Sequence, residues 1–411
     1  MTLRWSNRRL RRVICAGAAA GALAAAGIVP ATTASAVSSS RALSGSPVVF
    51  HAVLSETGFA AALGATEAKA LQVLAKEVNS TGGIDGHPMT VTIKDNDSTP
   101  STAVSFASKW VSEHVPFLLN GSVTATNRAV DALATSSGPF IYDLSPGDYP
   151  KPTSTVFSAG IATSLDAQAY LTFFKAKGLR RVAIINGTTS SGANGYTEFE
   201  AALKTKKLSG FTVTDHQTFT PTAPSVTTQL SAIKASHPQA LVIWVTGSPL
   251  GTVLKGMSAL GMDSIPTVTT DGDASYGLLT KLKSVLPKTL YFPTGPLYLP
   301  PKDLPPGPVR SDVQTFDKVV AAAGGHGGDP WGLAYTPALL LVGALKKLGI
   351  HATARQITNY MEHLHHVPGI YGYYTTSPTN HKGTILRDLY ITTFNGTSFV
   401  PHSGPGGVPT S

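Results

Sequence analysis

The architecture of this chain can be traced from one segment, Leu118-Leu119-Asn120-Gly121-Ser122-Val123-Thr124-Ala125-Thr126-Asn127. Apart from Pro116, apolar residues fill positions 115–119, and Gly and small hydroxyl residues follow them abruptly. A helical pattern of apolar residues then begins at Ala129. This order predicts a buried strand, a tight turn and the start of a helix.

The turn in this segment has two interpretations. Its backbone N–H groups and short hydroxyls would lie at the positive end of a helix, where a carboxylate is favoured. Ser and Thr also cap ordinary helices, and by itself the segment favours a plain N-cap. The choice depends on where the rest of the chain places the turn.

Length and charge limit the class of protein. A chain of 411 residues predicts two lobes or domains rather than one small core. The formal net charge is +9, but it includes Arg4, Arg8, Arg9, Arg11 and Arg12 near the N-terminus, and without them the charge is +4. No stripe of Lys and Arg interleaved with aromatic residues remains, so we expect no nucleic-acid partner.

The N-terminus has the pattern of a secretory signal peptide over residues 1–36. A basic segment precedes an Ala-rich apolar run at 13–29, and the cleavage pattern Ala34-Ser35-Ala36 follows. We therefore expect a secreted or periplasmic protein that starts near Val37. A transmembrane anchor fits less well because the run is short and weakly apolar, while Arg11-Arg12 leaves the Sec and twin-arginine export routes both open.

The only cysteine is Cys15, within this leader. Lipid attachment there is disfavoured, although not excluded, because Arg12 lies just before it and the apolar stretch lies after it. The mature chain would then contain no disulfide, so its stability must come from core burial.

Strand and helix patterns alternate along the chain. Strand patterns at 47–54, 89–94, 115–119 and 139–142 are separated by helical ones, and a second series begins at 181–185. Such alternation predicts α/β lobes, each with a parallel sheet covered by helices on both faces. Ligands of these sheets bind outside the carboxyl ends of the strands. Ser55, the turn at 121–124 and Ser145 all lie at such ends, which favours the carboxylate interpretation of the turn.

With these segments in order, the chain resembles the type I periplasmic solute-binding proteins of the leucine/isoleucine/valine-binding class, the receptor components of ABC importers. The likeness covers about residues 47–400. The matching segments are Leu71 with 76–88 (a helix, Asn79, then Gly82-Gly83-Ile84-Asp85-Gly86), Asp95 with 97–103, 120–126, 227–235, Leu260-Gly261 and Ala334-Tyr335.

The resemblance implies two doubly wound parallel-sheet α/β lobes joined by a three-stranded hinge, with a ligand in the cleft between them. Carried onto this chain, lobe 1 comprises 47–159 plus 297–368, and lobe 2 comprises 160–296 plus 369–400. The three crossings fall near 158–160, 293–297 and 368–369. The Gly- and Pro-rich residues 401–411 are expected to form a disordered tail.

The resemblance also implies a set of ligand-binding residues. Thr124, flanked by Ser122 and Thr126 in the hydroxyl-rich turn, falls where the family binds the ligand carboxylate, and Ser145 falls in a second carboxylate loop. Asp271 falls where the family places an acid for the ligand's α-amino group, although an Asp before Gly is also an ordinary turn residue. Two further positions, Ser191 and Ser248, stand where aromatic residues often line the side-chain pocket, which suggests a larger or more polar ligand.

Other chemistries have less support in the sequence. The run His363-Leu364-His365-His366 lacks the further ligands of a metal site, and Gly247-Ser248-Pro249-Leu250-Gly251 lacks the spacing of a nucleophilic serine elbow. We therefore expect no catalytic residues, no metal and no cofactor. The predicted function is capture of a small amino-acid-like or carboxylate ligand by a monomer and its delivery to a membrane ABC permease. The alternatives are a ligand sensor of the same fold and, less favoured, a secreted hydrolase.

Overall fold

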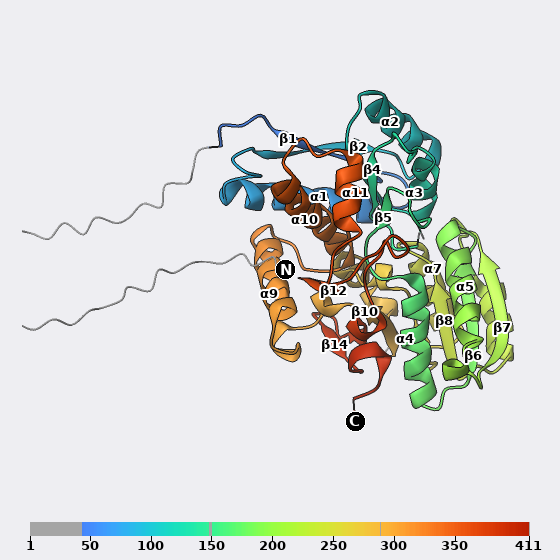
Figure 1. The fold of residues 1–411 in the computed structure, drawn as a ribbon. Helices are drawn as coiled ribbons and strands as arrows, with labels where there is room; N and C mark the ends of the chain where they lie inside the picture. The colour runs from blue at the N-terminus through green and yellow to red at the C-terminus, as the bar shows by residue number, and fades with distance from the viewer. Residues whose placement is uncertain (1–42, 148–149, 288, 411) are drawn as a thin grey trace, which may run out of the picture.

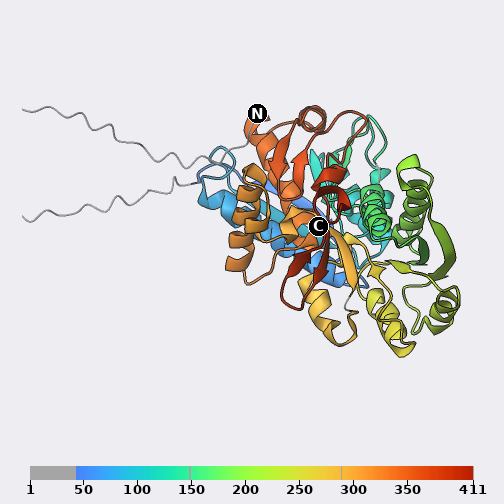
Figure 2. The same ribbon diagram turned by 90° about the horizontal axis from the view of Figure 1, so that it is seen from below.

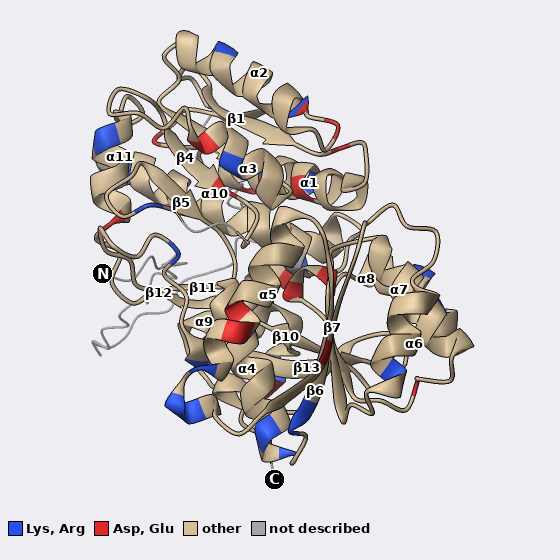
Figure 3. Ribbon diagram, turned by 90° about the vertical axis from the view of Figure 1, so that its right-hand side faces the viewer, with Lys and Arg blue, Asp and Glu red and all other residues tan. Residues whose placement is uncertain are grey.

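The computed structural model describes residues 43–147, 150–287 and 289–410, and in this part of the chain it shows two α/β lobes (Figure 1). The predicted signal peptide lies outside the described residues. Among the described helices, none is both long and apolar enough to cross a membrane. Figure 3 shows Lys and Arg scattered over both lobes.

The first lobe is built on a five-stranded sheet whose strands all run parallel, in the order β2-β1-β3-β4-β5. The strands are β1 (Val48–Leu54), β2 (Met89–Asp95), β3 (Phe117–Asn120), β4 (Phe140–Asp143) and β5 (Val156–Ser158). The helices of this lobe are α1 (Ala61–Ser80), α2 (Pro100–Ser112), α3 (Thr124–Asp131), α9 (Pro308–Ala322), α10 (Asp329–Leu348) and α11 (Ala354–Met361).

Both faces of this sheet are covered, as the alternation of patterns predicts. Alternate residues of β3 enter different clusters: Leu119 packs in the large core that includes α1 and α10, and Leu118 packs with Ala107 and Val130 of α2 and α3. Because successive side chains of a strand point to opposite faces, a strand between two helical layers is apolar throughout. The buried run at 117–119 follows from this position.

The second lobe has a seven-stranded sheet in the order β14-β13-β10-β9-β8-β6-β7. Its strands are β6 (Arg181–Gly187), β7 (Thr212–Phe219), β8 (Ala240–Trp244), β9 (Thr267–Val268), β10 (Leu290–Thr294), β13 (Tyr390–Phe394) and β14 (Phe399–Pro401). Its helices are α4 (Thr163–Ala176), α5 (Ser190–Leu203), α6 (Thr227–Ala235), α7 (Pro249–Ala259) and α8 (Tyr276–Lys281). The strands from β6 to β10 are parallel, whereas β13 and β14 are antiparallel additions beside β10 (Figure 2).

The chain crosses between the lobes after β5, after β10, and again before β13. The third crossing departs from the expectation that 369–400 belong to lobe 2 alone. A small antiparallel pair, β11 (Val367–Gly369) and β12 (Gly372–Tyr374), is followed by a segment that runs along β5. There Ser158 N donates to His381 O at 3.2 Å, and the His381 ring stacks on Phe157.

The prediction of a disordered tail from residue 401 is wrong. Pro401 ends β14 opposite Thr392, Ser403 is buried, and Gly406 N donates to Leu389 O at 2.7 Å. The composition of this segment is typical of disorder. Its glycines instead allow close approach to α4, since a Cβ on Gly407 would lie 2.2 Å from Ala169 O.

Candidate functional site

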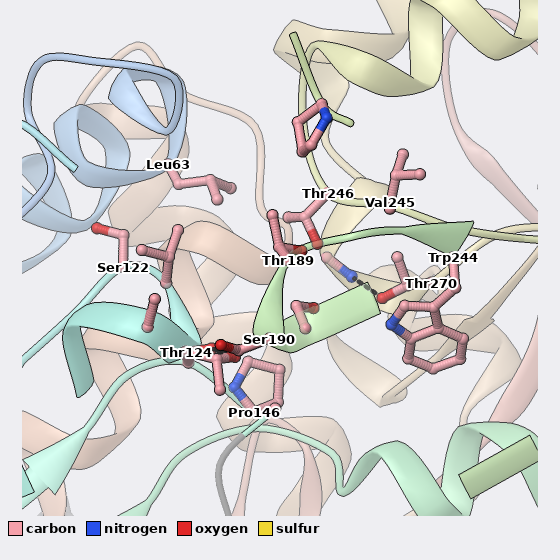
Figure 4. Close-up of a pocket in the computed structure, with 18 of the residues that line it drawn as sticks. Leu63, Ser122, Thr124, Pro146, Thr189, Ser190, Trp244, Val245, Thr246 and Thr270 are labelled. Atoms are coloured by element: carbon pink, nitrogen blue, oxygen red, sulfur yellow. Dashed lines mark hydrogen bonds between the residues drawn. The ribbon is translucent and has the colours of Figure 1, made fainter. Parts of the chain in front are cut away.

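A pocket lies between the two lobes at the carboxyl ends of their parallel strands (Figure 4). Lobe 1 contributes the segments after β3 and β4 and the start of α1, and lobe 2 contributes the segments after β6, β8 and β9. The empty volume is about 860 Å³ when the solvent at the open side is included. The site is therefore formed by strand ends of two sheets, which is where the sequence places the polar turns.

The first wall of the pocket presents hydroxyls beside a helix terminus. Thr124 is the first residue of α3 and is almost fully buried, and its Oγ1 lies 3.0 Å from Ser145 Oγ. The N-cap is Val123, which supplies no capping side chain, so the start of α3 is open to another acceptor. Gly147 lets the second loop approach, because a Cβ there would lie 2.4 Å from Thr124 Oγ1. This wall is suited to a carboxylate.

Ser122 also lines the pocket, but its hydroxyl already has partners. It accepts the N–H of Ser55 at 3.2 Å and donates to Oε2 of Glu67, an α1 residue with no exposed surface. In Figure 4 the Ser122 oxygen is turned away from the other labelled side chains. Burial raises the pKa of Glu67 to about 7, and the hydrogen bond from Ser122 opposes this shift.

The structure does not bring Thr126 and Ser248 to the pocket, contrary to the prediction. Thr126 is buried inside the turn, where its Oγ1 donates to Val123 O at 2.8 Å and to Gly121 O at 3.2 Å. Ser248 is exposed on the turn before α7. Thr126 therefore supports the shape of the turn, and Ser248 faces solvent.

The second wall carries the acid. Asp271 lines the pocket with 1% of its surface exposed, and its Oδ1 accepts hydrogen bonds from Thr270 Oγ1 at 2.9 Å and Gly272 N at 2.8 Å. Burial raises the pKa of Asp271, although hydrogen bonds from Thr270, Asp166 and Gly272 and the charge of Lys382 oppose this.

A second acid, Asp273, lies behind this wall. It is fully buried and accepts hydrogen bonds from Gly247 N at 2.8 Å and Thr269 Oγ1 at 2.7 Å. Burial raises its pKa to about 7, and the negative charge of Asp271 acts in the same direction. Asp273 holds the loop after β8 in place and does not line the pocket.

The remaining wall of the pocket is largely apolar. Ser191 lines this wall, and an aromatic side chain is present at Trp244, the last residue of β8. The Trp244 ring fills the space above Gly195, where a Cβ would lie 2.2 Å from it. From lobe 1, Leu63 and the 47% exposed Phe59 complete this side.

One buried cation connects the third crossing to the site. Lys382 Nζ donates to Pro146 O at 2.7 Å and to Ser158 Oγ at 2.8 Å. Pro146 lines the pocket, so Lys382 fixes the second carboxylate loop from behind. No Lys or Arg lines the pocket itself within the described part of the chain.

The comparison with known families agrees with this geometry. A family model described as periplasmic binding protein matches residues 47–398, most of the chain. The chain belongs to this family. Its members are solute-binding receptors that act outside the cytoplasm, and the type I fold predicted from the sequence is confirmed.

Individual relatives share the fold of this periplasmic binding protein at low sequence identity, or match only a short part of its sequence. An extracellular ligand-binding receptor from Rhodopseudomonas palustris is 18% identical, with a TM-score of 0.78 over 87% of this chain and 99% of that one. The substrate-binding protein LivJ of a branched-chain amino acid transporter from Streptococcus pneumoniae, solved with isoleucine, is 18% identical, with a TM-score of 0.72 over 86% of this chain and 99% of that one. Leu/Ile/Val-binding protein homolog 1 from Brucella abortus is 32% identical over 91 residues, which span only 22% of this chain and 24% of that protein.

Glu67, Trp244 and Lys382 are among the residues at this periplasmic binding protein's site that were not predicted from the sequence. Glu67 had a signal, since it is an acid within the apolar face of a helix, four positions after Leu63. Trp244 appeared to be a core residue because it ends a wholly apolar strand. Lys382 had no signal, because its role depends on the path of the third crossing. Within the described residues, no group of three or more His, Cys, Asp or Glu is placed to hold a metal ion.

Proposed function

We propose that this periplasmic binding protein captures a small amino-acid-like or carboxylate ligand between its lobes and delivers it to an ABC permease. The supporting observation is the pairing of opposite walls. Thr124, Ser145 and the open start of α3 offer donors on lobe 1, and Asp271 offers an acid on lobe 2. A ligand with a carboxylate and an ammonium group would complement both walls.

Binding of this kind would favour closure of the lobes. An ionised Asp271 is costly in a site this buried, and a ligand ammonium group would supply a cationic partner inside the pocket. A ligand that touches both lobes binds the closed arrangement better than the open one, so it shifts the population towards closure. The apolar wall of Leu63 and Trp244 would then enclose an apolar side chain.

The transport step is proposed by analogy with relatives. The S. pneumoniae protein LivJ is the substrate-binding protein of a branched-chain amino acid transporter. For this chain, residues 1–36 would direct export, and the closed, loaded protein would meet its permease as a monomer outside the cytoplasm.

Isothermal titration of the purified protein with the standard amino acids and with small carboxylic acids tests the proposal. We expect either the amino acids or the small carboxylic acids to bind. If an amino acid binds, Asp271→Ala should lower its affinity by at least tenfold, because the substitution removes the partner of the ammonium group. Asp263→Ala, an exposed acid of the same lobe, is the matched control and should bind as the wild type does. Full affinity in Asp271→Ala would remove Asp271 from the site.

A further inference from the structure

Glu67 occupies an unusual position for an acid. It projects from α1 into the region behind Ser122, it has no exposed surface, and a Cβ on Gly121 would lie 2.9 Å from its Oε2. The other oxygen, Oε1, has no hydrogen-bond partner among the described residues. An ionised carboxylate is poorly solvated in such a place, which is why its pKa lies near 7.

No described charged group compensates Glu67. The elements that pack most extensively against α1 are β1, β2, α9 and α10, and burial and Ser122 are the causes that shift the pKa of Glu67. Several of the titratable groups on those elements interact elsewhere: His51 with Glu113, Asp95 with Thr57, Lys94 with the Phe106 ring, Arg310 with Leu304 O, Asp312 and Glu77 with Tyr335, and Lys346 with Asp85. Lys69, on α1 itself, lies over the Trp331 ring. The protonation of Glu67 is therefore governed by its burial and, in the opposite direction, by the hydrogen bond from Ser122.

The hydrogen bonds of Ser122 can be counted. A serine hydroxyl has one hydrogen and two acceptor lone pairs. One lone pair receives the N–H of Ser55, and the hydrogen goes to Glu67. While Glu67 is ionised, Ser122 has no hydrogen left for a ligand, although it lines the carboxylate wall of the pocket.

We propose that Glu67 is a positioning residue that couples binding of a ligand carboxylate to uptake of one proton from solvent. This inference rests on the proposed function. Protonation of Glu67 removes the charge that holds the Ser122 hydroxyl, which points away from the other labelled side chains in Figure 4, and the hydroxyl can then turn about the Cα–Cβ bond towards the ligand. With Glu67 ionised, two anions would compete for one hydroxyl in a pocket that no described Lys or Arg lines. The carboxylate therefore selects the protonated form.

The sign of the pH dependence follows from this linkage. Below about pH 7 Glu67 already carries its proton, so its contribution to affinity is constant. Above that pH a proton must be taken up for each ligand bound, and affinity falls by about tenfold per pH unit. Gln at position 67 has a permanent N–H donor, so in Glu67→Gln this fall should be absent.

The test is titration with L-leucine and L-isoleucine between pH 6 and pH 9 for the wild type, Glu67→Gln and Glu77→Gln. Glu77 lies on the same helix, bound to Tyr335, and is the matched control. The quantity of interest is the ratio of affinities at each pH, because Asp271 and Asp273 titrate in all three proteins and cancel. We expect the affinity of the wild type relative to Glu67→Gln to fall about 50-fold from pH 7 to pH 9, with Glu77→Gln following the wild type.

Two further measurements keep the inference falsifiable. Titrations at pH 8 in buffers of different ionisation enthalpy should show uptake of close to one more proton per ligand by the wild type than by Glu67→Gln. Ser122→Ala removes the hydroxyl that connects Glu67 to the ligand but keeps Glu67, so it should lose the same pH dependence. This variant replaces Glu67→Gln in the test if Glu67→Gln does not fold. A ratio that stays constant with pH overturns the inference while leaving the proposed function intact, whereas absence of binding by every amino acid and carboxylic acid overturns both.

Discussion

Thr124 and Thr126 stand two positions apart on α3, yet their hydroxyls have different roles. Two helical steps turn a side chain by about 200°, so when Thr124 faces the pocket, Thr126 faces the strand end and closes the turn through Val123 O and Gly121 O. A hydroxyl-rich turn thus identifies the region of the site, and the helical register decides which hydroxyl reaches a ligand.

Removal of the Thr124 hydroxyl should weaken carboxylate binding. Thr124→Val keeps the shape of the side chain, and loss of a hydrogen bond to a charged group costs about 1.5–3 kcal/mol, so we expect affinity to fall by at least about tenfold. Titration with the ligand found in the screen measures this. Thr197→Val, an exposed threonine of α5, controls for the substitution itself. Unchanged affinity in Thr124→Val would assign the carboxylate to other donors.

At the scale of elements, sequence patterns predicted the structure correctly where it depends on residues that are close along the chain. The segment around Leu118 was interpreted correctly as strand, turn and helix, because a doubly covered strand is apolar throughout and a helix start needs polar residues. The C-terminal residues were misjudged, because their order comes from Leu389 and from Ala169, residues that lie close to them only in the fold. The same holds for Glu67 and Lys382, whose partners are 55 and at least 224 positions away.

The packing of the C-terminal segment on α4 predicts a specific sensitivity. Gly407 has φ of +76° and would place a Cβ 2.2 Å from Ala169 O, whereas Gly396 has φ of +101° and open space around it. Gly407→Ala should therefore destabilise the protein by about 1–3 kcal/mol more than Gly396→Ala, which bears the backbone cost alone. Urea unfolding of the two variants measures the difference. Equal effects would mean that the segment does not pack on α4.

At the scale of the whole molecule, each lobe keeps an acid buried behind the cleft. Glu67 lies behind the wall of lobe 1 and Asp273 behind that of lobe 2, and burial raises both pKa values to about 7. The two lobes thus meet across a pocket whose supporting acids prefer to be neutral. Stability and binding are linked to pH through the same side chains, because each acid also fixes a pocket segment, Ser122 or the loop at Gly247.

These two acids should make the protein less stable as the pH rises from 5 to 8. Their folded pKa values lie above the unfolded ones, so across this range the native state binds more protons than the unfolded state, and the free energy of unfolding decreases with pH. Each acid should lower the free energy of unfolding by about 2–3 kcal/mol between pH 5 and pH 8. Because other groups titrate as well, the measured quantity is the difference in unfolding free energy between the wild type and Glu67→Gln/Asp273→Asn. That difference should move in favour of the variant as the pH rises and level off above about pH 7. A difference that stays flat would show that both carboxyls ionise in the folded protein as readily as in the unfolded chain.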